Sequence, residues 1–421
     1  MKFTKLEKSW IMYDWANSVY ATIMVAAVFP IYFTGVCGSE GDFWWGIGTS
    51  IATTIMAVAA PFVGAVADYK GLKKKLLAGF LALGLVFVGL SALTDTWQVM
   101  LIGYIFSHIG FSGSVLIYDS FLTDVTTPER MDAVSSYGFA FGYIGGSTIP
   151  FLASILLISL GSNFGVDSVM AVKLSLWLTV LWWGVFSIPI LKNGQQRFGS
   201  DAPAAHPIKT TLLSVWSTIR NIIRNKKILF FVVAYFFYID GVNTVINMAT
   251  AYGATLGLDS TGMILALMVT QLVAFPCAIL FGKLSARTGS LTMIFAAILI
   301  YIGICCLGFF MGFGLEEGIL NVQQASAIFW VLAVLVGTVQ GGIQAISRSY
   351  YGKLVPPEAS GEYFGFFDIF GKFAAVLGPS LYALIKAVTG RSSFSILSIV
   401  VLFLLGLLPL TLGRKYLNDK N

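Results

Sequence analysis

Ionisable and amide side chains inside long apolar runs are the residues of this sequence that could do chemistry. Asp14 and Asn17 lie three positions apart in the first run, and Asp240 precedes Asn243 and Asn247 by three and seven positions in a later one. These spacings place each set on one face of a helix. A charge in mid-membrane costs at least about 2.5–3.5 kcal/mol, so it needs a partner, water or a proton. We expect both faces to bind a polar solute or a proton; the alternative for Asp14 is an interfacial or capping role.

A second group consists of Asp368 and Lys372, four positions apart in another apolar run. An acid four residues before a lysine is the favourable helix pairing, so an internal ion pair is one interpretation. In the other, Lys372 holds an anionic group such as a substrate carboxylate, acting as a point charge on a flexible stem. Both interpretations stay open at the level of sequence.

A third group lies at the ends of two runs in opposite halves of the chain. Asp119 ends one run, while Gln344 and Arg348 occupy one stripe of another, and Asp119 and Arg348 are 229 positions apart. Two related residues of opposite charge could meet when an inner gate closes. The alternative is that each is a solvated helix end.

The loop from Gly64 to Gly71 contains Asp68 and Lys70 and leads into a basic run at Lys73. A carboxylate at such a place can dock onto the positive N-terminus of a neighbouring helix. We expect this loop to contribute to the same gate.

The amino-acid composition excludes a soluble enzyme as the class of this protein. The 421 residues are 57% hydrophobic and 11% charged, with a mean hydropathy of +0.84, whereas soluble domains are about a quarter charged. At about 20 apolar residues per crossing, twelve spans use almost the whole chain. The predicted spans are 10–34, 43–67, 74–94, 97–121, 134–160, 170–191, 228–256, 260–285, 290–312, 325–350, 363–388 and 393–413.

The longest polar stretch divides these spans into six and six. It predicts an N-terminal bundle over 1–191, a cytoplasmic linker over 192–227 and a C-terminal bundle over 228–421. Lys and Arg gather in the termini, this linker and alternate loops, so both termini are expected in the cytoplasm. The chain is therefore predicted to be a multi-pass integral membrane protein, of the inner membrane if prokaryotic.

Several other classes of site have no support in the sequence. Three of the four cysteines lie in apolar runs, which indicates neither a disulfide framework nor a metal site. No nucleotide-binding loop occurs, no basic stripe faces nucleic acid, and no pair of groups suits nucleophilic catalysis. We expect no enzyme activity, cofactor or metal, and a monomer whose partners are the bilayer, a small solute and protons.

The two halves repeat each other at three places in the same order. Asp14 to Val19 matches Asp240 to Val245 at a shift of 226, Gly64 to Gly71 matches Gly282 to Gly289 at 218, and Pro128-Glu129 matches Pro357-Glu358 at 229. Each match is weak alone, but three in order with nearly constant shift indicate two homologous six-helix bundles. The fold class is therefore an all-α polytopic membrane protein with twelve transmembrane helices in two pseudo-symmetric bundles.

The loop from Gly64 through Asp68 and Gly71 to Lys75 resembles the signature between the second and third helices of the major facilitator superfamily. A narrower resemblance, to the vacuole-effluxer-like branch, is carried by the following segments: Tyr13 to Ser18, Gly138 to Gly146, Gln344 to Ser349, Gly371-Lys372 and Gly378-Pro379. The glycines of the second segment are expected to let the fifth helix pack closely on a neighbour.

This resemblance implies secondary transport by rocking of two bundles about a central site. Fungal members of the branch are associated with release of amino acids such as Leu, Ile and Tyr. The prediction is transport of a neutral or zwitterionic amino acid, coupled to protons. The alternatives are a larger amphiphilic or peptide-like solute, and a non-transporting membrane receptor on the same fold.

Overall fold

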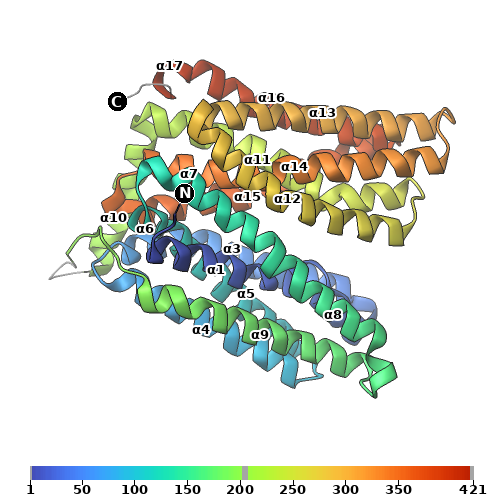
Figure 1. Ribbon diagram of the computed structural model, residues 1–421, viewed down its shortest axis with the longest axis horizontal. Coiled ribbons are helices and arrows are strands. Elements are labelled where there is room, and N and C mark those ends of the chain that lie inside the picture. The colour runs from blue at the N-terminus through green and yellow to red at the C-terminus, as the bar shows by residue number, and fades with distance from the viewer. Residues whose placement is uncertain (1, 202–206, 418–421) are drawn as a thin grey trace. The chain divides into compact units, whose positions relative to one another are not determined.

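Long helices make up almost all of the structure, a computed structural model that describes residues 2–201 and 207–417 (Figure 1). The first crossing is compound: α1 (Lys5–Tyr20) continues through the π-helical turn η1 (Ala21–Ala26) into α2 (Val28–Cys37). The chain then turns through η2 (Gly38–Glu40) into α3 (Gly41–Ala67), with Gly38 at a φ of 78° that suits glycine.

The other elements follow in chain order. They are α4 (Leu72–Leu93), α5 (Trp97–Ser120), α6 (Leu122–Val125), α7 (Pro128–Phe141), η3 (Gly142–Thr148), α8 (Ile149–Leu160), η4 (Gly161–Phe164), α9 (Ser168–Asn193), α10 (Pro207–Arg224), α11 (Lys226–Thr255), α12 (Ser260–Thr288), α13 (Ser290–Glu316), α14 (Val322–Leu354), η5 (Pro357–Ala359), α15 (Ser360–Thr389), α16 (Ser392–Leu412) and α17 (Arg414–Leu417).

Eleven segments within the described ranges are long and apolar enough to cross a membrane. The first of them, Lys5–Ala67, is 63 residues long and contains both the compound first helix and α3, which accounts for the twelfth crossing. The twelve-helix, all-α membrane fold predicted from the sequence is confirmed. Apolar side chains such as Val86, Leu181 and Leu299 are more than half exposed, as expected for helices that face lipid.

The chain forms two compact units. Unit 1 contains Met1–Arg130, Phe141–Trp216 and Val355–Asp368, and unit 2 contains Met131–Ala140, Ser217–Leu354 and Ile369–Asn421. Most of α7 thus packs with unit 2, and the first part of α15 packs with unit 1. The division predicted at 192–227 describes homologous halves of the chain and stays a prediction; residues 202–206 of that linker lie outside the described part.

Close helix packing in unit 1 depends on the glycines of the fifth crossing. η3 packs on α1, where a Cβ on Gly145 would lie 1.8 Å from the Trp15 ring and one on Gly146 would lie 2.3 Å from Ser18 Cβ. Only glycine leaves room for this approach. The structure therefore confirms that these glycines let the helix pack closely. Gly145 and Gly146 thereby help to position α1, the helix that carries Asp14 and Asn17.

In unit 2, α14 packs on α12 and α13, and α11 packs on α16. Glycines again set the spacing, because a Cβ on Gly342 would lie 2.3 Å from the Phe281 ring and one on Gly337 would lie 2.8 Å from the Thr270 carbonyl oxygen. These contacts position α11 and α14, which carry most of the polar residues of this unit.

Candidate functional site

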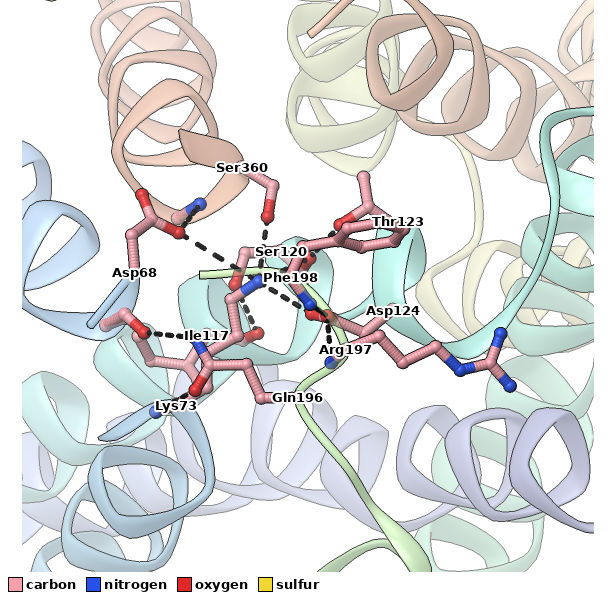
Figure 2. A network of polar contacts seen from close by, with 12 residues as sticks. Asp68, Lys73, Ile117, Ser120, Thr123, Asp124, Gln196, Arg197, Phe198 and Ser360 are labelled. Carbon is pink, nitrogen blue, oxygen red and sulfur yellow. Dashed lines mark hydrogen bonds and ion pairs between the residues drawn. The ribbon is translucent and has the colours of Figure 1, made fainter. Parts of the chain in front are cut away.

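A buried ion pair lies at the end of unit 1 where α3 stops and α4 begins. Lys73 Nζ is 2.7 Å from Asp124 Oδ2, and both side chains are fully buried (Figure 2). The same ammonium donates to Ser360 Oγ at 2.7 Å and to the Ser120 carbonyl oxygen at 3.4 Å. A buried charge is tolerated only when its partners are close and its hydrogen bonds are satisfied. Lys73 therefore ties α4 to α5, α6 and the start of α15.

Asp68 caps the N-terminus of α15 within the same unit. Its carboxylate accepts the backbone N–H of Gly361 at 2.7 Å and that of Glu362 at 2.8 Å. These amides have no partner inside their own helix, and the helix dipole favours an anion there. A Cβ on Gly64 would lie 2.1 Å from the Gly361 carbonyl oxygen, so glycine permits the approach of α3.

The ionisation of Asp68 is balanced between opposing influences. Burial raises the pKa of its carboxyl from about 3.8 to about 7, while Lys73, 4.0 Å away, and the two amide N–H groups act against this rise. The nearby Glu362 raises the pKa further. Asp68 in this arrangement therefore changes charge near neutral pH.

The polar segment after α9 is part of this network. Asp124 Oδ1 accepts the backbone N–H groups of Arg197 at 2.7 Å and Phe198 at 2.9 Å (Figure 2). Lys70, by contrast, lies outside the network: it forms an ion pair of 2.9 Å with Asp201, and the two side chains are 63% and 87% exposed. The sequence interpretation named Asp68 and Lys73 but missed Asp124, whose contacts join segments far apart in the chain.

A second polar network occupies the related end of unit 2. Asp132 of α7 is 2.6 Å from Lys353 Nζ and accepts hydrogen bonds from three hydroxyl groups. These belong to Ser285 near the end of α12, Ser290 at the start of α13 and Ser349 on α14. One carboxylate thereby joins α7, α12, α13 and α14.

Two residues of each network occupy equivalent positions in the predicted internal repeat. Lys353 and Ser349 stand 229 positions after Asp124 and Ser120, and Asp132 stands 229 before Gly361. At one of these positions the charge is reversed, because Asp124 lies at the end of the α5–α6 region in unit 1 and the equivalent position in unit 2 carries Lys353. Asp68 has Ala286 at its repeat position.

Arg348 is also buried in unit 2. Its Nε donates to Ser135 Oγ at 2.9 Å, and its guanidinium lies over the Phe139 ring at 4.4 Å. Gln344 lies one turn earlier on α14 and is half-buried, and Asp119 is half-buried on α5 in unit 1. The proposed meeting of Asp119 with Arg348 joins different units and stays a prediction.

Asp240 lies fully buried in the middle of α11. Its carboxylate accepts the backbone N–H of Gly378 at 3.0 and 2.9 Å and the Thr244 hydroxyl at 3.4 Å. Pro379 follows inside α15, where a proline disrupts the hydrogen bonding of the preceding turn. A Cβ on Gly378 would lie 1.8 Å from Thr244 Oγ1, so glycine is required. Among the described residues, Asp240 forms no ion pair.

The other residues of the predicted binding faces differ in burial. Asn243 is half-buried and Asn247 is exposed. Asp14 and Asn17 are buried in α1, and Asn17 Nδ2 has no hydrogen-bond partner within the described ranges. Asp14 is nine residues from the start of α1 and Asp240 fourteen from the start of α11, a difference of roughly 7 Å along a helix.

Asp368 and Lys372 are both half-buried on α15. Asp368 is the last residue of the α15 segment that packs with unit 1, and Lys372 belongs to unit 2. Their pairing, and the alternative role of Lys372 toward a substrate carboxylate, stay predictions.

Two solved structures share this fold over nearly their whole length. The human organic anion transporter MFSD10 (TETRAN) matches with a TM-score of 0.67 at 13% identity, covering 97% of this chain and 99% of that one. A bacterial homologue of the iron transporter ferroportin matches with a TM-score of 0.71 at 11% identity, covering 98% of each. The chain therefore shares the fold of these two proteins.

Sequence comparison gives the particular family. The chain belongs to the family described as "Vacuole effluxer Atg22 like", which matches residues 46–129 and 123–413. The MFS-type transporter YxiO of Bacillus subtilis (strain 168) is 41% identical over 419 residues, covering 97% of this chain and 95% of that one. Autophagy-related protein 22-2 of Aspergillus clavatus is 28% identical over 301 residues, which cover 66% of this chain and 48% of the fungal protein. The matched region thus spans about half of the fungal relative.

The ion pair of Lys73 and Asp124 makes a prediction about stability. Lys73→Met should lower the free energy of unfolding by about 3–5 kcal/mol, because it leaves Asp124 buried without its cation. Adding Asp124→Asn should recover much of this loss, since an amide oxygen still accepts the Arg197 and Phe198 amides. Denaturant titration of the purified protein measures both.

Lys70→Met is the matched control, because it removes a lysine of the same loop from an exposed pair, which is worth about 0–1 kcal/mol. If the two losses at Lys73 and Asp124 simply add, the pair is not the stabilising unit.

The raised pKa of Asp68 predicts a pH dependence. The folded protein holds the proton more tightly than the unfolded chain, so the contribution of Asp68 is most favourable below about pH 4 and is lost as the pH rises toward about 7. The difference in unfolding free energy between the wild type and Asp68→Asn should therefore shrink over this range. A difference that grows with pH would show that Asp68 is stabilised as the anion.

Proposed function

We propose that the protein carries a small neutral or zwitterionic amino acid across the membrane by alternating access, coupled to protons. The observation that carries the proposal is the environment of Asp240. This buried carboxylate is held by backbone and hydroxyl donors and, in the described part of the chain, by no cation. An acid in a membrane helix that lacks a cation is suited to bind and release a proton.

The contact with Gly378 supplies a route from protonation to movement. The carboxylate accepts the amide of Gly378, the residue before Pro379, which lies inside α15. A hydrogen bond to a charged acceptor is about twice as strong as one to a neutral acceptor. Protonation of Asp240 would weaken its hold on this turn and free the two parts of α15 to change their angle.

A substrate contact in unit 1 is supported by Asn17. Its Nδ2 group is buried without a partner within the described ranges, and an unpaired buried donor costs about 1–3 kcal/mol. A substrate carboxylate would satisfy it. In this proposal Asp14 faces the substrate amine, and Asn243, Asn247 and Lys372 provide further polar contacts.

In the proposed cycle, the two polar networks, around Lys73 in unit 1 and around Asp132 in unit 2, act as locks that hold helices in one position. The Lys and Arg distribution supports a cytoplasmic location for the ends that carry Asp68 and Asp132. Lys73 and Asp68 would hold the start of α15, and Lys353 and Asp132 would hold α7 in the repeated half. Asp119, Gln344 and Arg348 would complete the cytoplasmic gate, with Lys70 at its exposed edge.

Family membership supports a transported solute. The family description names effluxers, and YxiO is named as a transporter over nearly the full length of both chains. The direction, the inner-membrane location and the amino-acid substrate belong to the proposal.

The test is transport by the purified protein in liposomes. Wild type should show counterflow of labelled leucine, and an imposed pH difference should drive its accumulation. Asp240→Asn imitates the protonated acid, so it should retain counterflow and lose accumulation. Asp259→Asn is the matched control, because Asp259 is an exposed N-cap of α12 in the same unit.

Accumulation by Asp240→Asn that matches the wild type would remove Asp240 as the coupling group. Absence of counterflow for leucine and the other neutral amino acids in the wild type would overturn the substrate proposal, and a receptor on this fold would behave in that way.

A further inference from the structure

A cavity lies inside unit 2, between α11, α12, α13, α14 and α16, with about 730 Å³ of unfilled space including its mouth. Apolar and aromatic side chains such as Phe329, Met311 and Ile304 form most of its wall. Val245 and Ala249 present one face of α11 to it, whereas Asp240 and Thr244 form their contacts with Gly378 of α15. The cavity is therefore separate from the Asp240 site.

Two amide side chains in the wall have unmet hydrogen-bonding atoms. Gln271 Oε1 on α12 and Gln340 Nε2 on α14 are buried and have no partner among the described residues, and Gln340 is only 2% exposed. A buried polar atom without a partner destabilises the folded state unless a ligand or water satisfies it. One is an acceptor that needs a donor, and the other is a donor that needs an acceptor. A helix core of leucines would have filled the same space without this penalty.

The positions of the two amides define the shape of a ligand. The Thr270 hydroxyl, next to Gln271 in sequence, donates to the Ala333 carbonyl of α14. Gln340 lies seven residues further along α14, roughly 10 Å on a helix. Phe329 lies eleven residues before Gln340. The space is thus elongated, with polar groups at one end and in the middle and an apolar remainder.

The charge of a ligand follows from the lining, in which the described residues include no Asp, Glu, Lys, Arg or His side chain. A zwitterion would lose its hydration here and gain no counter-charge, which disfavours its binding. An uncharged amide has both the donor and the acceptor that the two glutamines require.

We propose that this cavity is a second binding site, specific for an uncharged amide with apolar substituents. Gln340 donates to the ligand carbonyl and Gln271 accepts from its N–H, while the branched or aromatic substituents fill the space toward Phe329. The site does not depend on the proposed transport of amino acids, because it lacks the charges that a zwitterion needs.

The probe is the cyclic dipeptide cyclo(L-leucyl-L-phenylalanyl), and its matched control is linear leucyl-phenylalanine, which has the same side chains but charged ends. Equilibrium dialysis with the full chain in nanodiscs should show binding of the cyclic compound and much weaker binding of the linear one. Gln340→Leu and Gln271→Leu should each weaken binding by about 2- to 12-fold, the value of one hydrogen bond. Gln98→Leu, at an exposed position in unit 1, should bind like the wild type.

A second measurement leaves both glutamines in place. Cys305 lines the cavity and is 1% exposed. In Cys306→Ala, bound cyclic dipeptide should slow modification of Cys305 by methyl methanethiosulfonate, as followed by mass spectrometry, and the linear dipeptide should not. Equal binding of the two compounds, binding unaffected by the glutamine substitutions, or unprotected Cys305 would each overturn the proposal. Neither measurement involves transport, so its failure is distinguishable from failure of the transport proposal.

Discussion

An ammonium group buried in a membrane protein must have a carboxylate beside it, and this requirement organises one end of unit 1. Lys73 is fully buried and 2.7 Å from Asp124. Its remaining donors contact Ser360 and the Ser120 carbonyl, while the other oxygen of Asp124 accepts two amides of the segment after α9. Removing either charge would leave the other unpaired in a low dielectric. The pair therefore holds together α4, the α5–α6 region, the start of α15 and the segment after α9. Asp68 adds a helix cap that the same lysine faces more weakly.

Unit 2 contains a second acid of this kind, Asp132, with Lys353 beside it. Asp132 accepts hydrogen bonds from Ser285, Ser290 and Ser349, and the ammonium of Lys353 neutralises its charge. Under the predicted repeat, one charged position of the two networks coincides, and it carries Asp124 in unit 1 and Lys353 in unit 2. In the proposed cycle the two locks can therefore differ in their response to pH, since Asp68 titrates near neutrality, whereas Asp132 has a lysine at 2.6 Å.

The helices could be predicted from the sequence because each is a long apolar run, and a membrane leaves few other structures for such runs. The segment that contains Asp68 and Lys73 could be found because its glycines and charges have a regular spacing.

The roles of Asp124, Asp132 and Ser360 could not be predicted from the sequence, since their partners lie far away in the chain and no local sequence pattern indicates them. The role of Gly378 likewise depends on a carboxylate from another helix. Lys70 shows the reverse case: it shares the loop of Asp68 but points outward to Asp201. The π-helical turns within the first and fifth crossings also have no signature in the apolar pattern.

In the proposed cycle, the contact of Asp68 and Lys73 with the start of α15 opens and closes as solute is carried. Hydrogen–deuterium exchange of the peptide covering 355–368, in nanodiscs with and without leucine, tests it directly. The Gly361 and Glu362 amides are held by Asp68, so their exchange should be slow without leucine and rise by about tenfold or more when leucine drives the cycle, which is a change of about 1.4 kcal/mol in the opening free energy. Exchange in this peptide that stays unchanged in a preparation active in leucine counterflow would contradict the claim, because the lock would then be a fixed part of the fold.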